Sequence, residues 1–253
     1  MATCPASLPV VLRFTLAGIP VGVHVSFLII AVVSPSNQPV DMAVWVVIAF
    51  LAVLLHEAGH AFTARHFGAD PVSITLFALG GVTTFAASKD LTPRRRLVIA
   101  SAGSLVGITV GGLVWLIWSA GVFDDVPPTA RLAASGFIWA SLGWGLLNWI
   151  PIRPLDGGAM LTSFLEIVIP RRAVPVAKVV SAVTGAVAAF ALWRIGSTFG
   201  AFFVVLITLA GLRSEPAEVA RTGPTPGGME TTRAGDLSDD EGEPPAQPPA
   251  FPI

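Results

Sequence analysis

Six stretches of mostly apolar residues run along the first 213 residues, separated by short segments rich in proline, glycine and charge. One α-helical crossing of a bilayer needs about 20 apolar residues, so the pattern predicts about six transmembrane helices, with the first and last short. After the second stretch, residues 74–87 place two β-prone runs on either side of Gly80 and Gly81, which predicts a β-hairpin. The expected fold is an α-helical polytopic membrane protein with a small membrane-associated β-hairpin or sheet. The predicted spans are residues 22–34, 40–66, 97–119, 133–150, 174–193 and 198–212.

Composition agrees with this pattern and separates a tail from the core. Hydrophobic residues make up 53% of the chain and charged residues 12%, with a mean hydropathy of +0.75, which is outside the range of soluble globular proteins. Half of the 16 acidic residues fall after position 213, in a segment rich in proline and poor in aliphatic residues. We therefore expect an intramembrane core over residues 1–213 and a disordered Pro-rich, acidic cytoplasmic tail over residues 214–253.

The distribution of positive charge predicts the orientation. With the N-terminus inside, every Lys and Arg except Arg131 and Arg194 falls on the cytoplasmic side, as the positive-inside rule requires. The sequence thus predicts a multi-pass protein of the cell membrane with both termini in the cytoplasm. The lipid bilayer is an expected partner. A basic, aromatic surface is missing from the sequence, and no nucleic-acid partner is expected.

The second apolar stretch ends in ionisable residues, HEAGH at positions 56–60. Residues i and i+4 share one face of a helix, so His56 and His60 can bind one zinc ion. Glu57 lies about 100° away around the helix, near a metal-bound water rather than the metal. A carboxylate at membrane depth costs at least ~2.5–3.5 kcal/mol and is a functional candidate for that reason.

Catalytic zinc usually has three protein ligands, which requires one more. Apart from Glu57, Asp156 is the one acidic residue of the core predicted at an apolar position. It follows Asn148 in NWIPIRPLDGG, a stretch whose prolines and glycines predict a broken helix. Irregular backbone at membrane depth is tolerated where it lines a protein cavity. We expect His56, His60 and Asp156 to form one site.

These paired motifs resemble the site-2 protease family of intramembrane zinc metalloproteases, peptidase family M50, in a compact form without PDZ or CBS domains. The resemblance extends over residues 13–213 and includes GIPVGVHVSF and FALGGV. It implies one Zn²⁺ per chain held by His56, His60 and Asp156, with Glu57 as the catalytic glutamate. Asn148 matches the family's motif asparagine, and we expect it to help stabilise the oxyanion. SAGSLVG at 101–107 departs from the family, in which a proline and an asparagine often follow the AG.

The expected function is cleavage of peptide bonds in or near transmembrane segments by zinc-activated water, as in regulated intramembrane proteolysis. The resemblance implies a single-span membrane protein as substrate, with anti-sigma factors among the family's usual targets. Two alternatives are a non-proteolytic zinc-binding membrane scaffold and a metal transporter, of which the first has no need for Glu57. The predicted hairpin offers an edge strand at residues 82–85 for an unwound substrate; the alternative is a purely structural hairpin.

Overall fold

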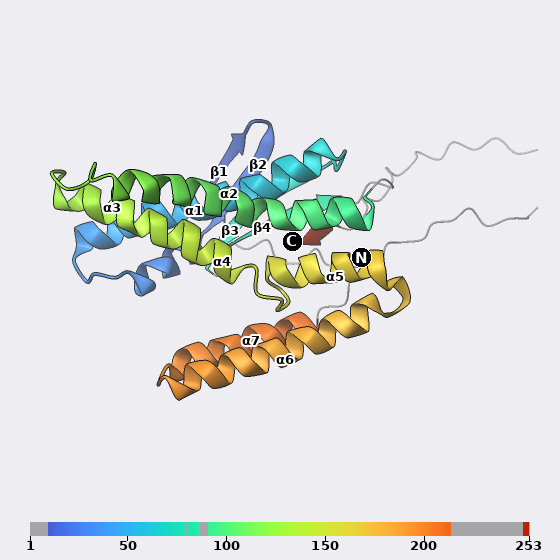
Figure 1. The fold of residues 1–253 in the computed structure, drawn as a ribbon. Coiled ribbons are helices and arrows are strands. Elements are labelled where there is room, and N and C mark those ends of the chain that lie inside the picture. The colour runs from blue at the N-terminus through green and yellow to red at the C-terminus, as the bar shows by residue number, and fades with distance from the viewer. Residues whose placement is uncertain (1–9, 79, 87–90, 214–249, 253) are drawn as a thin grey trace, which may run out of the picture.

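The computed structural model describes residues 10–78, 80–86, 91–213 and 250–252, and shows helices arranged around a small mixed sheet (Figure 1). The strands pair in the order β1-β2-β3-β4-β5; β2 and β3 are parallel and the other neighbours antiparallel. The strands are β1 (Val10–Leu16), β2 (Ile19–His24), β3 (Val72–Phe77), β4 (Gly80–Ala86) and β5 (Ala250–Pro252).

Among the described residues, three helices are long and apolar enough to cross a membrane, namely α1, α2 and the run formed by η3 and α6. Pro39 begins α1 at a position that needs no amide donor, and Thr92 caps α2 by accepting a hydrogen bond from the Arg95 amide. The helices of this group are α1 (Pro39–His66), α2 (Pro93–Ser119), η3 (Pro170–Arg172) and α6 (Ala173–Arg194).

The remaining helices are shorter. The run from α3 through the π-helical turn η2 to α4 is continuous over 20 residues, while α5 is short and α7 has 16 residues. In Figure 1, α6 and α7 lie side by side apart from α1–α4, and α5 connects the two groups through contacts with α2 and α6. The bounds are η1 (Val25–Val33), α3 (Pro128–Ile138), η2 (Trp139–Gly143), α4 (Trp144–Leu147), α5 (Asp156–Val168) and α7 (Thr198–Arg213).

The first predicted span, residues 22–34, is wrong. Its start belongs to β2, and the rest forms the nine-residue 3-10 helix η1, which is too short to cross a bilayer as a helix. His24 ends β2 and caps η1, accepting a hydrogen bond from the Ser26 amide, so a polar cap interrupts the apolar run. The other predicted spans correspond to helical segments, but three spans, not six, meet the length and hydropathy of a membrane crossing.

The predicted hairpin is confirmed, with a different turn. β3 and β4 are antiparallel, and Phe77 pairs with Gly80 while Leu76 pairs with Gly81. Both glycines therefore belong to β4 instead of forming the turn. Residues on the buried face of the hairpin join the core with α1, and this packing holds β4 beside the HEAGH turn.

The tail prediction is wrong at its last residues. Ala250–Pro252 form β5 and pair with β4, whereas the sequence predicted disorder to residue 253. Residues 214–249 and 253 lie outside the described residues.

Candidate metal centre and catalytic glutamate

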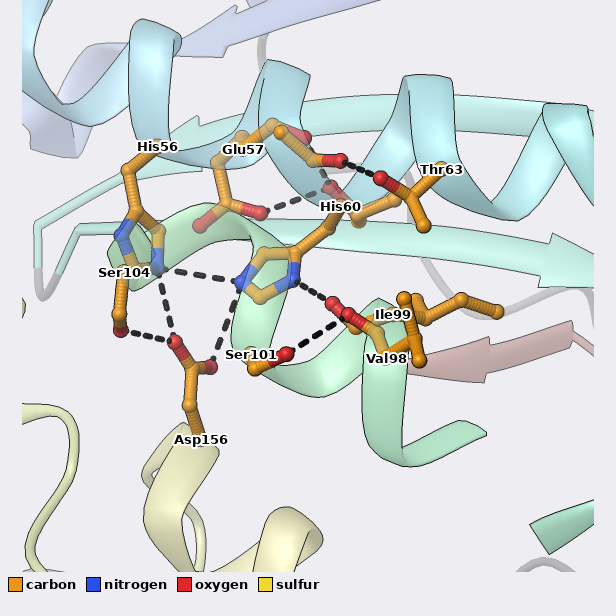
Figure 2. Close-up of polar contacts among 11 residues, drawn as sticks. His56, Glu57, His60, Thr63, Val98, Ile99, Ser101, Ser104 and Asp156 are labelled. Atoms are coloured by element: carbon orange, nitrogen blue, oxygen red, sulfur yellow. Dashed lines mark hydrogen bonds and ion pairs between the residues drawn. The ribbon is translucent and has the colours of Figure 1, made fainter. Parts of the chain in front are cut away.

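Helix α1 supplies three of the predicted site residues. His56, Glu57 and His60 are all buried, with exposed fractions of 6%, 4% and 1%. The two imidazoles lie one turn apart and point to the same side, with 3.2 Å between their Nε2 atoms (Figure 2). Apart from the ionisable residues of its first and last turns, helix α1 thus places its ionisable groups in one turn against the protein interior.

Asp156 approaches the histidines from below as the first residue of α5 (Figure 2). Its Oδ2 lies 3.2 Å from His56 Nε2, and its Oδ1 lies 3.3 Å from His60 Nε2. The preceding loop folds back so that the Gly157 amide donates to the Asn148 carbonyl at 2.6 Å. A Cβ on Gly157 would overlap the carbonyl oxygens of Trp149 and Ile150, so this close return needs glycine. The broken helix predicted from sequence is what places the carboxylate.

The three side chains fit a zinc ion. His60 Nδ1 lies 2.7 Å from the Ile99 carbonyl oxygen, which can only accept, so Nδ1 carries a proton. In the neutral ring, Nε2 is then a bare lone pair that faces His56 and Asp156. The 3.2–3.3 Å separations match the edge of a tetrahedron whose metal–ligand bonds are about 2.0–2.1 Å. Two histidines and one carboxylate are also a ligand set of catalytic zinc sites.

Helix α2 orients two of these ligands. The Ile99 carbonyl fixes His60, and Ser104 Oγ donates to Asp156 Oδ2 at 2.9 Å. The helices approach closely because Gly59 faces the Ala102 carbonyl, where a Cβ would lie at 2.8 Å, and because a Cβ on Gly103 would overlap the His60 ring. Ser104 lies in SAGSLVG and was not predicted as a site residue. The one sequence signal at this segment was its departure from the family pattern, and that signal did not identify Ser104 itself.

Strand β4 holds Glu57. The fully buried Thr83 hydroxyl donates to Glu57 Oε2 at 2.8 Å and also contacts the Glu57 carbonyl oxygen at 3.1 Å. A Cβ on Gly81 would overlap Glu57 Cγ, so Gly81 makes the space that the carboxylate occupies. Glu57 is outside the group of three metal-binding side chains, as its position around the helix predicted. Thr83 and Gly81 were missed as site residues because nothing in the sequence gives the register of β4 against α1.

Asn148 is buried beside the same loop, directly after α4. Its backbone carbonyl, which accepts from the Gly157 amide, fixes the turn that leads to Asp156. The role of its amide side chain in binding an oxyanion stays a prediction.

Comparisons with known proteins agree with this site. The model of the family described as peptidase family M50 matches residues 44–135, which contain HEAGH. A zinc metalloprotease of Methanocaldococcus jannaschii is 34% identical over 158 residues, 60% of this chain and 44% of that protein. The stage IV sporulation protein FB of Bacillus subtilis is 29% identical over 111 residues, 44% of this chain and 36% of that protein.

The fold is also similar to a solved structure, the site-2 protease from Methanocaldococcus jannaschii. The TM-score is 0.55, with 23% identity, and the match covers 82% of this chain and 97% of that structure. The chain spans less than half the length of the two sequence relatives. The family model covers the HEAGH turn of α1. This chain is therefore similar to peptidase family M50 over residues 44–135, and its fold is similar to that of a site-2 protease.

Proposed function

We propose that this protein is an intramembrane zinc metalloprotease that cleaves peptide bonds in or near the transmembrane segments of single-span membrane proteins. The observation that carries the proposal is the arrangement of HEAGH with Asp156: three converging ligands, and a separate carboxylate beside them held by Thr83. We further propose that the protein lies in the cell membrane with both termini in the cytoplasm, as the positive charges favour. Residues 22–34 form no helical span, but β1 and β5, the first and last strands of the chain, belong to one sheet, which supports both termini on the same side. We propose that the protein acts in regulated intramembrane proteolysis, with anti-sigma factors as one substrate class.

His56, His60 and Asp156 would hold the zinc, which supplies Lewis-acid activation of water and of the scissile carbonyl when bound. Glu57 accepts the proton of the attacking water through the carboxylate oxygen that Thr83 leaves free. Glu57 then returns this proton to the leaving amine, so that the carbon–nitrogen bond breaks with a neutral amine as product. The Asn148 amide is the candidate donor to the oxyanion.

A helical substrate hides its scissile carbonyl in its own hydrogen bonds and must be extended before attack. We propose that β4 receives the extended segment by strand addition, because β4 touches Glu57 and forms the edge of the hairpin. This edge lies on the same element that positions the catalytic carboxylate. Binding and catalysis are therefore adjacent.

The test uses purified protein in liposomes with a single-span substrate. We expect cleavage that 1,10-phenanthroline stops and that added Zn²⁺ restores. A zinc-sensitive dye inside the same liposomes measures transport in parallel. Zinc uptake without cleavage would favour a transporter, and stable zinc binding with neither activity would favour a scaffold.

A further inference from the structure

The outer edge of β4 is occupied in this structure by a segment of the same chain. β5 pairs antiparallel with β4, so that Ala250, Phe251 and Pro252 lie opposite Ala86, Phe85 and Thr84. In the sequence this segment follows the core helices at a distance, with residues 214–249 between Arg213 and Ala250. The contact is the last strand pairing of the sheet among the described residues.

The direction of the backbone groups on β4 shows which residues hold a strand at this edge. The Ala86 amide donates to the Pro71 carbonyl at 3.1 Å, on the side of β3. Backbone groups alternate between the two sides of a strand, so the amide and carbonyl of Phe85 point outward to β5. By the same alternation, Thr83 and Gly81 also present outward backbone groups.

The sequence of β5 suits this register. Phe251 lies opposite Phe85, where a docked strand must donate and accept. Pro252 has no amide hydrogen, and it lies opposite Thr84, whose backbone groups face β3. The proline is therefore at a position that requires no donor, which is where an edge strand tolerates it.

The segment also runs toward the catalytic glutamate. From Ala250 to Pro252 the chain passes along β4 from Ala86 to Thr84. The next residues of β4 with outward backbone groups are Thr83, which hydrogen-bonds Glu57, and Gly81, which packs on it. A substrate strand that pairs with Thr83 and continues along this edge to Phe85 would use the backbone groups that β5 uses, so this strand and β5 would exclude each other.

We propose that residues 250–252 occupy the substrate-strand position on β4, so that the C-terminal segment of this chain competes with substrate for the edge. This rests on the proposed proteolytic function. Because residues 214–249 tether the segment to the core, its binding is intramolecular and needs little intrinsic affinity. The tail then sets how much of the enzyme is open to substrate.

Cross-linking in the full chain tests the occupancy. In a Cys4→Ser background, the test pair is Ala86→Cys with Ala250→Cys, at two positions that lie directly opposite each other. They form a non-hydrogen-bonded pair, the type in which opposed residues of antiparallel strands are closer and a disulfide can form. The control pair is Ala86→Cys with Ala246→Cys. We expect a disulfide in the first pair at least fivefold faster than in the control. Equal rates would overturn the proposal.

Substrate affinity tests the competition. In the Glu57→Gln full chain, Phe251→Pro removes the amide opposite Phe85, and the matched control is Ala246→Pro. If β5 leaves the β4 edge free in about half to a tenth of the molecules, the apparent Kd is raised by the inverse of that fraction. We therefore expect Phe251→Pro to lower the Kd for a single-span substrate roughly two- to tenfold. The same Kd in both variants would overturn the proposal. Neither measurement requires proteolysis, so loss of cleavage by the wild-type enzyme would count against the proposed function alone.

Discussion

Thr83 is the residue on which the position of the Glu57 carboxylate depends most directly. Its fully buried hydroxyl donates a hydrogen bond to Glu57 Oε2 at 2.8 Å. A hydrogen bond to a charged group contributes about 1.5–3 kcal/mol. Glu57 can act as a base only if its carboxylate stays beside the ligand group, so Thr83 is a positioning residue.

Replacing Thr83 by valine keeps the shape of the side chain and removes the hydroxyl. We expect Thr83→Val to lower kcat about 10- to 100-fold, the range that 1.4–3 kcal/mol corresponds to, with zinc content unchanged. Thr83→Ser is the matched control and should recover most of the activity. Equal kcat in the valine and serine variants would show that the hydroxyl has no part in catalysis.

Ser104 positions Asp156, the proposed third metal ligand, in the same way. Removing hydrogen-bond partners of metal ligands typically weakens metal affinity 10- to 100-fold. We expect this loss in zinc affinity for Ser104→Ala, measured by competition with a chelator. Ser101→Ala is the control on the same helix, because the Ser101 hydroxyl donates to the Val98 carbonyl oxygen of its own helix. An unchanged zinc affinity in Ser104→Ala would show that Ser104 does not support zinc binding through Asp156.

The sequence identifies the candidate ligand residues, but it does not identify the residues that hydrogen-bond to them. His56, Glu57, His60 and Asp156 stand out because ionisable groups are costly in an apolar helix, a property visible in sequence alone. Ser104 and Thr83 are ordinary small polar residues. Their importance depends on the Gly59–Ala102 contact and on the register of β4, which arise from tertiary packing.

At the scale of elements, the sheet has two different edges. Away from β5, the opposite edge is β1, which pairs only with β2. β4 contacts Glu57 through Thr83, whereas β1 contacts α1 through Phe14 and Phe50, about two helical turns before Glu57. A substrate strand should therefore use one edge and avoid the other.

Cysteine cross-linking of a trapped substrate distinguishes the two edges. In the Glu57→Gln, Cys4→Ser background, Thr84→Cys places a thiol on β4, and Thr15→Cys places one on the exposed edge strand β1. We expect a substrate carrying one cysteine near its scissile bond to cross-link through position 84 and not through position 15. Cross-linking through position 15 alone, or equally through both, would show that substrate extension does not involve β4.

Periodicity predicted the elements better than their boundaries. The hairpin was visible in the two β-prone runs of residues 74–87, but the glycine pair that suggested a turn serves another purpose. Gly81 leaves space for Glu57, and a local pattern cannot distinguish a glycine needed for a turn from one needed for a close approach. The first apolar run was misread for a related reason, since a strand and a 3-10 helix can be as apolar as a membrane span.

At the scale of the whole molecule, an ion pair connects two of the helices that build the site. Arg96 on α2 pairs with Glu166 on α5 at 2.5 Å, and this ion pair joins the helix of Ser104 to the helix of Asp156. The orientation of the whole assembly in the bilayer is a prediction from charge alone. The position of β5 was not predictable, because a Pro-rich segment gives no sign of which edge it will meet.

The single native cysteine allows the orientation to be measured. We expect Cys4 to react with a membrane-impermeant maleimide only after the cells are permeabilised, because the N-terminus is predicted to be cytoplasmic. In a Cys4→Ser background, Thr198→Cys at the start of α7 should react in intact cells. The opposite pattern of labelling would show that the protein has the reverse orientation in the membrane.

The central claim is that His56, His60 and Asp156 bind the zinc with which Glu57 cleaves peptide bonds. Its most direct test measures zinc content and cleavage of a single-span substrate on the same purified preparations. We predict one zinc per chain and cleavage for the wild type, one zinc and no cleavage for Glu57→Gln, and loss of both for Asp156→Ala. Cleavage by Glu57→Gln, or a full zinc content in Asp156→Ala, would contradict the account.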